Sequence, residues 1–153
     1  MAIKTLEEIS ETIRDIDFVI LSTRTVDGAI AARPMSNNRE VDFKGHSYFF
    51  ALEHSRVIAD IRHDPQVGLS YQSKSGLLHN KPLFVAVEGF AELIRDKGGF
   101  AAHWTKEMDD YFPKGADTPD LVLIKVTAER MHYWDGGEEG EIIVTAPVVV
   151  THI

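Results

Sequence analysis

The chain has 153 residues, with 24 acidic side chains against 16 basic ones and a formal net charge of −8. This excess of negative charge disfavours general electrostatic binding to nucleic acid or to an anionic membrane. The absence of cysteine excludes disulfides, thiolate metal sites and cysteine nucleophiles. The first residues lack the apolar core of a signal peptide, and no apolar run is long enough to span a bilayer. We therefore expect one cytoplasmic domain over residues 1–153.

The N-terminal half alternates helical and extended patterns. A capping box of Thr5 and Glu8 predicts a helix over residues 5–16. Two extended stretches, residues 18–23 and 29–35, flank an Asp-Gly turn and predict a β-hairpin. Residues 48–52 lack alternation, which predicts a strand buried on both faces. Ser55 is expected to cap a helix over residues 56–63, followed by a strand at 67–71.

The C-terminal half is expected to hold more strands and one further helix. A loop at residues 72–82 precedes a long strand at 83–94, which Gly89 is expected to bend. Apolar residues four apart, Phe100, Trp104 and Met108, predict a helix over residues 96–110. Strands are expected at 121–126 and 131–134, a turn at 135–137, and a last strand at 142–150, interrupted by Pro147, within the tail 141–153.

Six to eight short strands with helices at the ends predict a mostly β fold, a small antiparallel β-barrel with flanking helices. A parallel, doubly wound sheet is disfavoured, since the pattern lacks regular alternation of strands and helices.

Two short basic signatures suggest a phosphate site. Arg33 opens the run Arg33-Pro34-Met35-Ser36 at the end of a predicted strand, and Arg56 follows Ser55 at a predicted helix start. An arginine beside hydroxyl or backbone donors can hold a phosphate by charge-assisted hydrogen bonds, and a helix N-terminus favours an anion. We therefore expect a phosphorylated cofactor. The alternative is that these arginines pair with nearby carboxylates such as Asp60.

The order of these motifs resembles the FMN-binding split barrel of the pyridoxamine 5′-phosphate oxidase superfamily. The resemblance rests on residues 32–35, the aromatic run 48–51, the pair 55–56 and the segment 64–69. Residues 111–115, 119–121 and 133–135 are similar to its general stress protein 26 branch.

The resemblance implies an antiparallel, Greek-key split β-barrel that forms a homodimer, with FMN, or FAD as the alternative, in a groove between the subunits. It implies that arginines and a serine hold the phosphate and that an aromatic strand lines the flavin ring. The implied cofactor-binding residues are Arg33, Pro34, Met35, Ser36, Phe50, Ala51, Ser55, Arg56, Val57 and Trp134.

Two features depart from the oxidase pattern. Val57 stands where the oxidases carry a lysine, so one phosphate cation is missing. The chain also ends in an apolar run, residues 148–150, followed by Thr-His-Ile, without the basic signature that grips the vitamin substrate. These departures argue against oxidation of pyridoxamine 5′-phosphate. The same apolar run is expected to need a partner, which favours a two-fold dimer.

Other candidate residues have simpler readings. Trp104 is expected to belong to the core. Trp134 ends a strand, and two positions stay open for it, inside the dimer groove or outside it. The seven histidines lack the spacing of a metal site, so no metal is expected.

The resemblance implies an FMN-dependent oxidoreductase acting on a small substrate, with the chemistry supplied by the flavin and no catalytic residue identifiable. The alternative is a non-catalytic flavin-binding or flavin-buffering stress-response protein. A deazaflavin or haem in the same barrel is a third reading.

Overall fold

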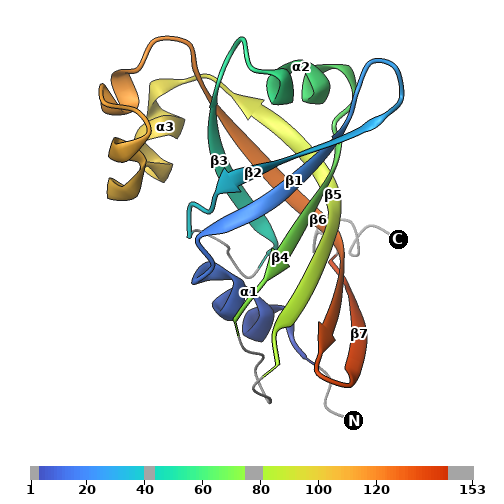
Figure 1. Cartoon of the computed structure of the whole chain (residues 1–153). Helices are drawn as coiled ribbons and strands as arrows, with labels where there is room; N and C mark the ends of the chain where they lie inside the picture. Colours follow the sequence, from blue (N-terminus) through green and yellow to red (C-terminus); the bar gives the residue numbers. More distant parts are fainter. Residues whose placement is uncertain (1–3, 40–43, 75–80, 145–153) are drawn as a thin grey trace, which may run out of the picture.

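The computed structural model describes residues 4–39, 44–74 and 81–144, which form a seven-stranded, antiparallel and strongly twisted sheet (Figure 1). Six strands follow the order β2-β1-β4-β5-β6-β3, and β7 also pairs with β6. The sheet is not closed: β2 forms one edge, and β3 and β7 lie along different parts of β6 at the other. The mostly β split-barrel fold is confirmed. The strands are β1 (Phe18–Arg24), β2 (Ile30–Ser36), β3 (His46–Leu52), β4 (Gln66–Gln72), β5 (Leu83–Ile94), β6 (Leu121–Asp135) and β7 (Glu138–Ile143).

Helices lie at the ends and one side of this sheet. In Figure 1, α1 and α2 lie at opposite ends, and α3 with the short 3₁₀ helices lies beside β3. Within the described ranges, no helix has the length and apolar character needed to cross a membrane. The helices are α1 (Leu6–Arg14), α2 (Arg56–His63), α3 (Lys97–His103), η1 (Lys106–Asp110) and η2 (Gly115–Asp117).

Local sequence determines the first elements as expected. The backbone amide of Glu8 donates to Thr5 Oγ1 at 3.1 Å, which confirms the N-terminal half of the capping box. Helix α1 then buries Ile9 and Ile13 against the sheet. Strand β1 alternates, with Leu21 fully buried and Ile20 exposed on the opposite face.

Two hydrophobic clusters hold the molecule together. The main core lies between the sheet, α1 and α2, and includes Leu21, Phe49 and Ile58. A smaller aromatic cluster joins β3 and β6 to α3 and η1 through Phe50 and Phe100. Because Phe49 and Phe50 point into different clusters, the prediction that β3 is buried on both faces is confirmed.

The helix predicted over residues 96–110 is confirmed only in its first half. Helix α3 ends at His103, and Trp104 is extended, with φ −73° and ψ 131°. The Trp104 ring packs on Phe50 with centroids 4.8 Å apart, and its Nε1–H donates to Asp109 at 2.9 Å. Residues five apart do not face each other on a helix, so this contact requires the break. Trp104 packs against the aromatic cluster, as expected.

The two strands predicted at 121–126 and 131–134 are one continuous strand, β6. Gly89 pairs with Ala128 and Glu88 with Arg130, so Glu129 is the extra residue of a β-bulge. A Cβ on Gly89 would lie 2.2 Å from the carbonyl oxygen of Thr127, so the close approach at the bulge requires glycine. The bulge thus replaces the predicted interruption.

The last strand also begins earlier than predicted. The turn at residues 135–137 is confirmed, with Gly136 at φ 64°, and it pairs β7 directly with the end of β6. Strand β7 therefore spans Glu138–Ile143 rather than starting at residue 142. Pro147 and the apolar run 148–150 lie outside the described residues.

Candidate functional site

Arg33 lies on the free-edge strand β2 and points toward α2. Its Nη1 donates to Thr23 Oγ1 at 2.7 Å and to the carbonyl oxygen of Leu21 at 3.4 Å. Its Nη2 donates to Asp60 Oδ2 at 3.2 Å. The Arg33–Asp60 pair considered from the sequence is therefore present, with the Asp60 side chain 5% exposed and that of Arg33 19% exposed.

These contacts leave part of the guanidinium available. Three of its five N–H donors have acceptors, and both hydrogens of Nη1 are used. Nε–H and one hydrogen of Nη2 have no acceptor within the described part of the chain, and they lie side by side on one edge of the planar group. Such an edge is the fork that binds a phosphate or carboxylate with two parallel hydrogen bonds.

The start of α2 offers further donors. Ser55 occupies the N-cap position, but its hydroxyl donates to the carbonyl oxygen of Leu52 at 2.7 Å and caps no helix amide. The capping bond expected from the sequence is therefore wrong, although the helix begins where predicted. The first-turn amides have no side-chain cap, and a helix N-terminus in this state favours an anion.

Arg56 follows directly and is exposed. Among the described residues it makes no hydrogen bond or ion pair. Asp60 lies four residues further along α2, about one helical turn away. The network of Arg33 thus ends on the same helix that begins at Arg56, so the two basic signatures are brought to one region.

The remaining predicted residues are divided between the two faces of the sheet. Met35 packs against the main core, as does Val57, which is 5% exposed. Phe50 and Ala51 are buried on β3, at 7% and 8% exposure, within different clusters. Their predicted contact with a flavin ring stays a prediction.

The outward face of the sheet carries the other predicted residues. Pro34 pairs with Ile20, and this register places it, and Ser36 two residues on, opposite in direction to Arg33. Trp134 pairs with Phe84 on this same outward face and is 38% exposed. Within one chain Trp134 and Arg33 therefore point to opposite sides, and a shared cofactor would need a second copy.

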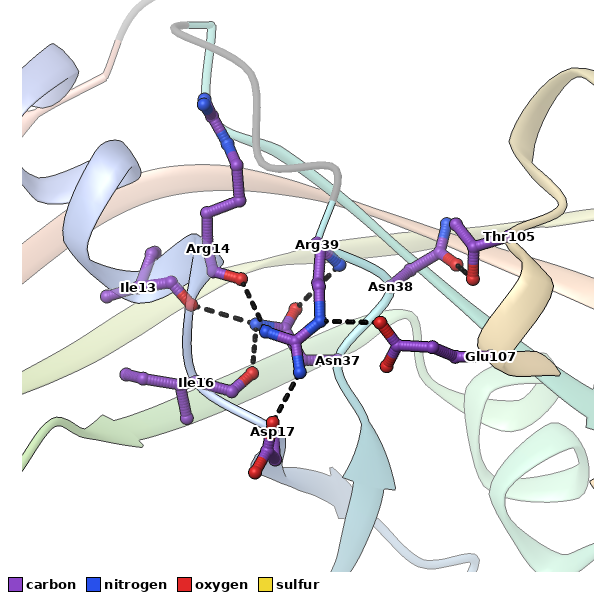
Figure 2. Close-up of polar contacts among 9 residues, drawn as sticks. All are labelled: Ile13, Arg14, Ile16, Asp17, Asn37, Asn38, Arg39, Thr105 and Glu107. Atoms are coloured by element: carbon purple, nitrogen blue, oxygen red, sulfur yellow. Dashed lines mark hydrogen bonds and ion pairs between the residues drawn. The ribbon is translucent and has the colours of Figure 1, made fainter. Parts of the chain in front are cut away.

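A polar cluster that sequence reasoning missed follows directly after β2. Figure 2 shows Asn37 donating to the carbonyl oxygens of Ile13 and Ile16, at 2.8 and 2.7 Å. Arg39, at φ 58°, bonds Glu107 at 3.0 Å and also Asp17, a contact that raises the pKa of Arg39. This cluster ties the end of β2 to α1 and η1.

A second charged cluster lies just before α2. Glu53 accepts two hydrogen bonds from Arg95, at 2.6 and 3.0 Å, and one from Arg62 at 2.5 Å. The hydrogen bond from Arg95 is the main cause that lowers the pKa of Glu53. The Glu53 carboxylate therefore offsets the charges of Arg62 and Arg95. Arg56 has no such carboxylate partner among the described residues.

Asp60 was considered from the sequence only as an alternative partner, and Thr23 was not considered at all. A signal for both is present. Asp60 lies among the apolar residues of α2 that face the core, and Thr23 continues the inward positions of β1 after Leu21. A polar residue at a core-facing position requires a hydrogen-bond partner.

Comparison with known families agrees with this fold. The chain belongs to the family described as pyridoxamine 5′-phosphate oxidase like, whose model matches residues 4–153. The resemblance inferred from the motifs is thereby confirmed. A search of curated proteins gave no match.

Solved structures share the fold at low sequence identity. A Clostridium acetobutylicum protein related to general stress protein 26 matches with a TM-score of 0.77 and 19% identity, covering 91% of this chain and 94% of that one. General stress protein 26 from Bacillus anthracis matches with a TM-score of 0.73 and 22% identity, over 90% and 97%. A heme binding protein from Mycobacterium smegmatis matches with a TM-score of 0.73 and 15% identity, over 94% and 60%.

Proposed function

We propose that this protein binds FMN and acts as an FMN-dependent oxidoreductase on a small substrate. The observation that carries the proposal is that the free Arg33 edge, the uncapped start of α2 and Arg56, which has no partner among the described residues, are brought to one region. These groups suit a phosphate dianion, because each charged hydrogen bond contributes roughly 1.5–3 kcal/mol. Family membership supports a flavin as the phosphate's carrier.

The residues of this chain would bind and orient the cofactor. Arg33, Ser55, Arg56 and the amide of Val57 would hold the phosphate. Bound FMN would supply the redox chemistry, so the protein needs no side-chain acid or base for the electron transfer itself.

We propose a two-fold dimer to complete the site. The outward face of β1, β2 and β5 exposes Phe18, Ile20, Ile30 and Phe84, at 56%, 40%, 80% and 42%. Their strand register places them on one face with Trp134. Exposed apolar residues gathered on one face can mark an interface, and a two-fold partner would cover them with the same face of its own.

Sedimentation tests the dimer. We expect twice the chain mass for the wild type and for Val26→Lys, because Val26 lies in the β1–β2 turn. Ile20→Lys should produce monomers, since it places a charge within the apolar face. A wild-type monomer at all concentrations, or an Ile20→Lys dimer of unchanged affinity, would contradict the proposed interface.

The cofactor is tested by its spectrum and by mass spectrometry of whatever denaturation releases. We expect FMN, and a haem spectrum would instead favour the activity named for the Mycobacterium smegmatis protein. Arg56→Ala should weaken FMN binding by roughly 2–3 kcal/mol, about 30- to 150-fold, with riboflavin binding unchanged. Arg130→Ala, which changes the charge equally on β6, is the control.

Catalysis is tested separately from binding. Anaerobic reduction of the bound flavin by NADH or NADPH should bleach its visible band faster than for free FMN. A rate no faster than in solution would favour the alternative, a non-catalytic flavin-binding or flavin-buffering protein. Pyridoxamine 5′-phosphate should not be oxidised.

A further inference from the structure

Three side chains from three elements form a closed ring of hydrogen bonds beneath α2. Arg33 Nη1 donates to Thr23 Oγ1 at 2.7 Å, the Thr23 hydroxyl donates to Asp60 Oδ2 at 2.8 Å, and Arg33 Nη2 donates to the same Oδ2 at 3.2 Å. Thr23 is 1% and Asp60 3% exposed. The ring therefore lies in a largely dry environment, where hydrogen bonds fix geometry strongly.

The ring determines which edge of Arg33 is left free for a ligand. Nη1 donates to Thr23 and Nη2 donates to Asp60. The guanidinium therefore cannot turn its Nη1–Nη2 edge toward a ligand without breaking the ring. Nε–H and the second Nη2–H then remain on the free edge. A fork held in one orientation loses less conformational freedom on binding than a mobile arginine does.

We infer that Thr23 and Asp60 are positioning residues that present the free edge of Arg33 to the cofactor phosphate. The inference rests on the proposed FMN binding and deepens it by adding two residues that need not touch the ligand. Asp60 also joins Arg33 to α2, so the two halves of the phosphate site keep a fixed relation. The Thr23 hydroxyl closes the ring without adding charge.

Thr23→Val is the decisive variant, because valine keeps the shape of threonine and leaves every charge in place. We expect it to weaken FMN binding about tenfold, at the scale of one charged hydrogen bond, with riboflavin binding unchanged. Thr23→Ser retains the hydroxyl and should bind FMN as the wild type does. In an Arg33→Met background, Thr23→Val should have no further effect on the FMN-to-riboflavin affinity ratio.

Asp60→Asn provides an independent second variant, should Thr23→Val fail to fold. We expect a loss of FMN affinity of about tenfold, again without loss for riboflavin. Tighter FMN binding in Asp60→Asn would mean that the carboxylate only offsets the charge of Arg33, and would overturn the inference.

The remaining outcomes separate this inference from the proposed function. The inference fails alone if Arg33→Met lowers the FMN-to-riboflavin ratio but Thr23→Val does not. It also fails if Thr23→Val weakens both ligands equally, or if its effect persists without Arg33, because either result indicates a general structural role. A wild-type protein that binds FMN no better than riboflavin would overturn both.

Discussion

Two buried ion pairs, at different places in the sheet, differ in what they leave exposed. Lys4 Nζ lies 2.8 Å from Asp135 Oδ2, and their side chains are 2% and 0% exposed. Arg33 and Asp60 are 3.2 Å apart, but the Arg33 side chain is 19% exposed. The first pair is sealed between the segment before α1 and the end of β6, next to the turn into β7. The second opens at the free edge of β2.

The surroundings explain the difference. The backbone N–H of Lys4 also donates a hydrogen bond to Tyr133 Oη at 3.3 Å. The segment before α1 is therefore anchored to β6 by an ion pair and by a hydrogen bond. Its ammonium is a compact charge that the single carboxylate offsets. Arg33 instead shares three acceptors and retains unused donors. A sealed pair holds chain segments together, whereas an open one can also bind a ligand.

The largest expected effect is on stability at the sealed pair. Lys4→Met leaves the Asp135 carboxylate buried without its cation, which should lower the free energy of unfolding by about 3–5 kcal/mol. Urea denaturation measures this loss. Lys4→Met combined with Asp135→Asn should recover a large part of it, because no unpaired charge remains. Full additivity of the two single variants would show that the pair makes no specific contribution.

The open pair should matter less for stability. Asp60→Asn removes the charge from the acceptor of two hydrogen bonds, yet Arg33 keeps Thr23 and Leu21 as acceptors and reaches solvent. We expect a loss of about 2 kcal/mol in the free energy of unfolding. Lys4→Met should leave the FMN-to-riboflavin affinity ratio unchanged, whereas Asp60→Asn should lower it. Equal effects of both variants on that ratio would remove the distinction between the pairs.

Local patterns predicted the parts of this fold that depend on neighbours in sequence. The capping box of α1, the β1–β2 hairpin and the limits of α2 follow from residues a few positions apart, and all were predicted closely. Residues 96–110 carry helical spacing but break at Trp104, because contacts with Phe50 and Asp109 outweigh that local preference. Tertiary packing decides there.

The two arginines of the site were predictable from the sequence, but the hydrogen bonds that orient Arg33 were not. Arg33 and Arg56 were identified from motifs, while the bonds that orient Arg33 join residues 10, 27 and 37 positions apart. The pair between Lys4 and Asp135 joins the two ends of the described chain. Single-sequence patterns carry no information on such pairings, apart from the hint that a polar residue on an apolar face needs a partner.

The smallest expected effect concerns the cluster of Glu53, Arg62 and Arg95. It extends the comparison of the two ion pairs to one near the surface, and pH is the variable. Arg95, and to a lesser degree Arg62, lower the pKa of Glu53 below its ordinary value of 4.5. A carboxyl whose pKa is lower in the folded state contributes stability above its unfolded pKa and loses it as the pH falls through the folded value.

Urea denaturation of wild type and Glu53→Gln across this range should therefore give a constant difference in unfolding free energy above pH 4.5, which shrinks as the solution becomes more acidic. Arg95→Gln should remove more of this pH-dependent part than Arg62→Gln, because Arg95 makes the bidentate contact. Both effects should weaken in high salt, since these side chains are exposed to solvent. If the difference in unfolding free energy stays constant as the pH falls well below 4.5, Glu53 acts through packing before α2 and not through its charge.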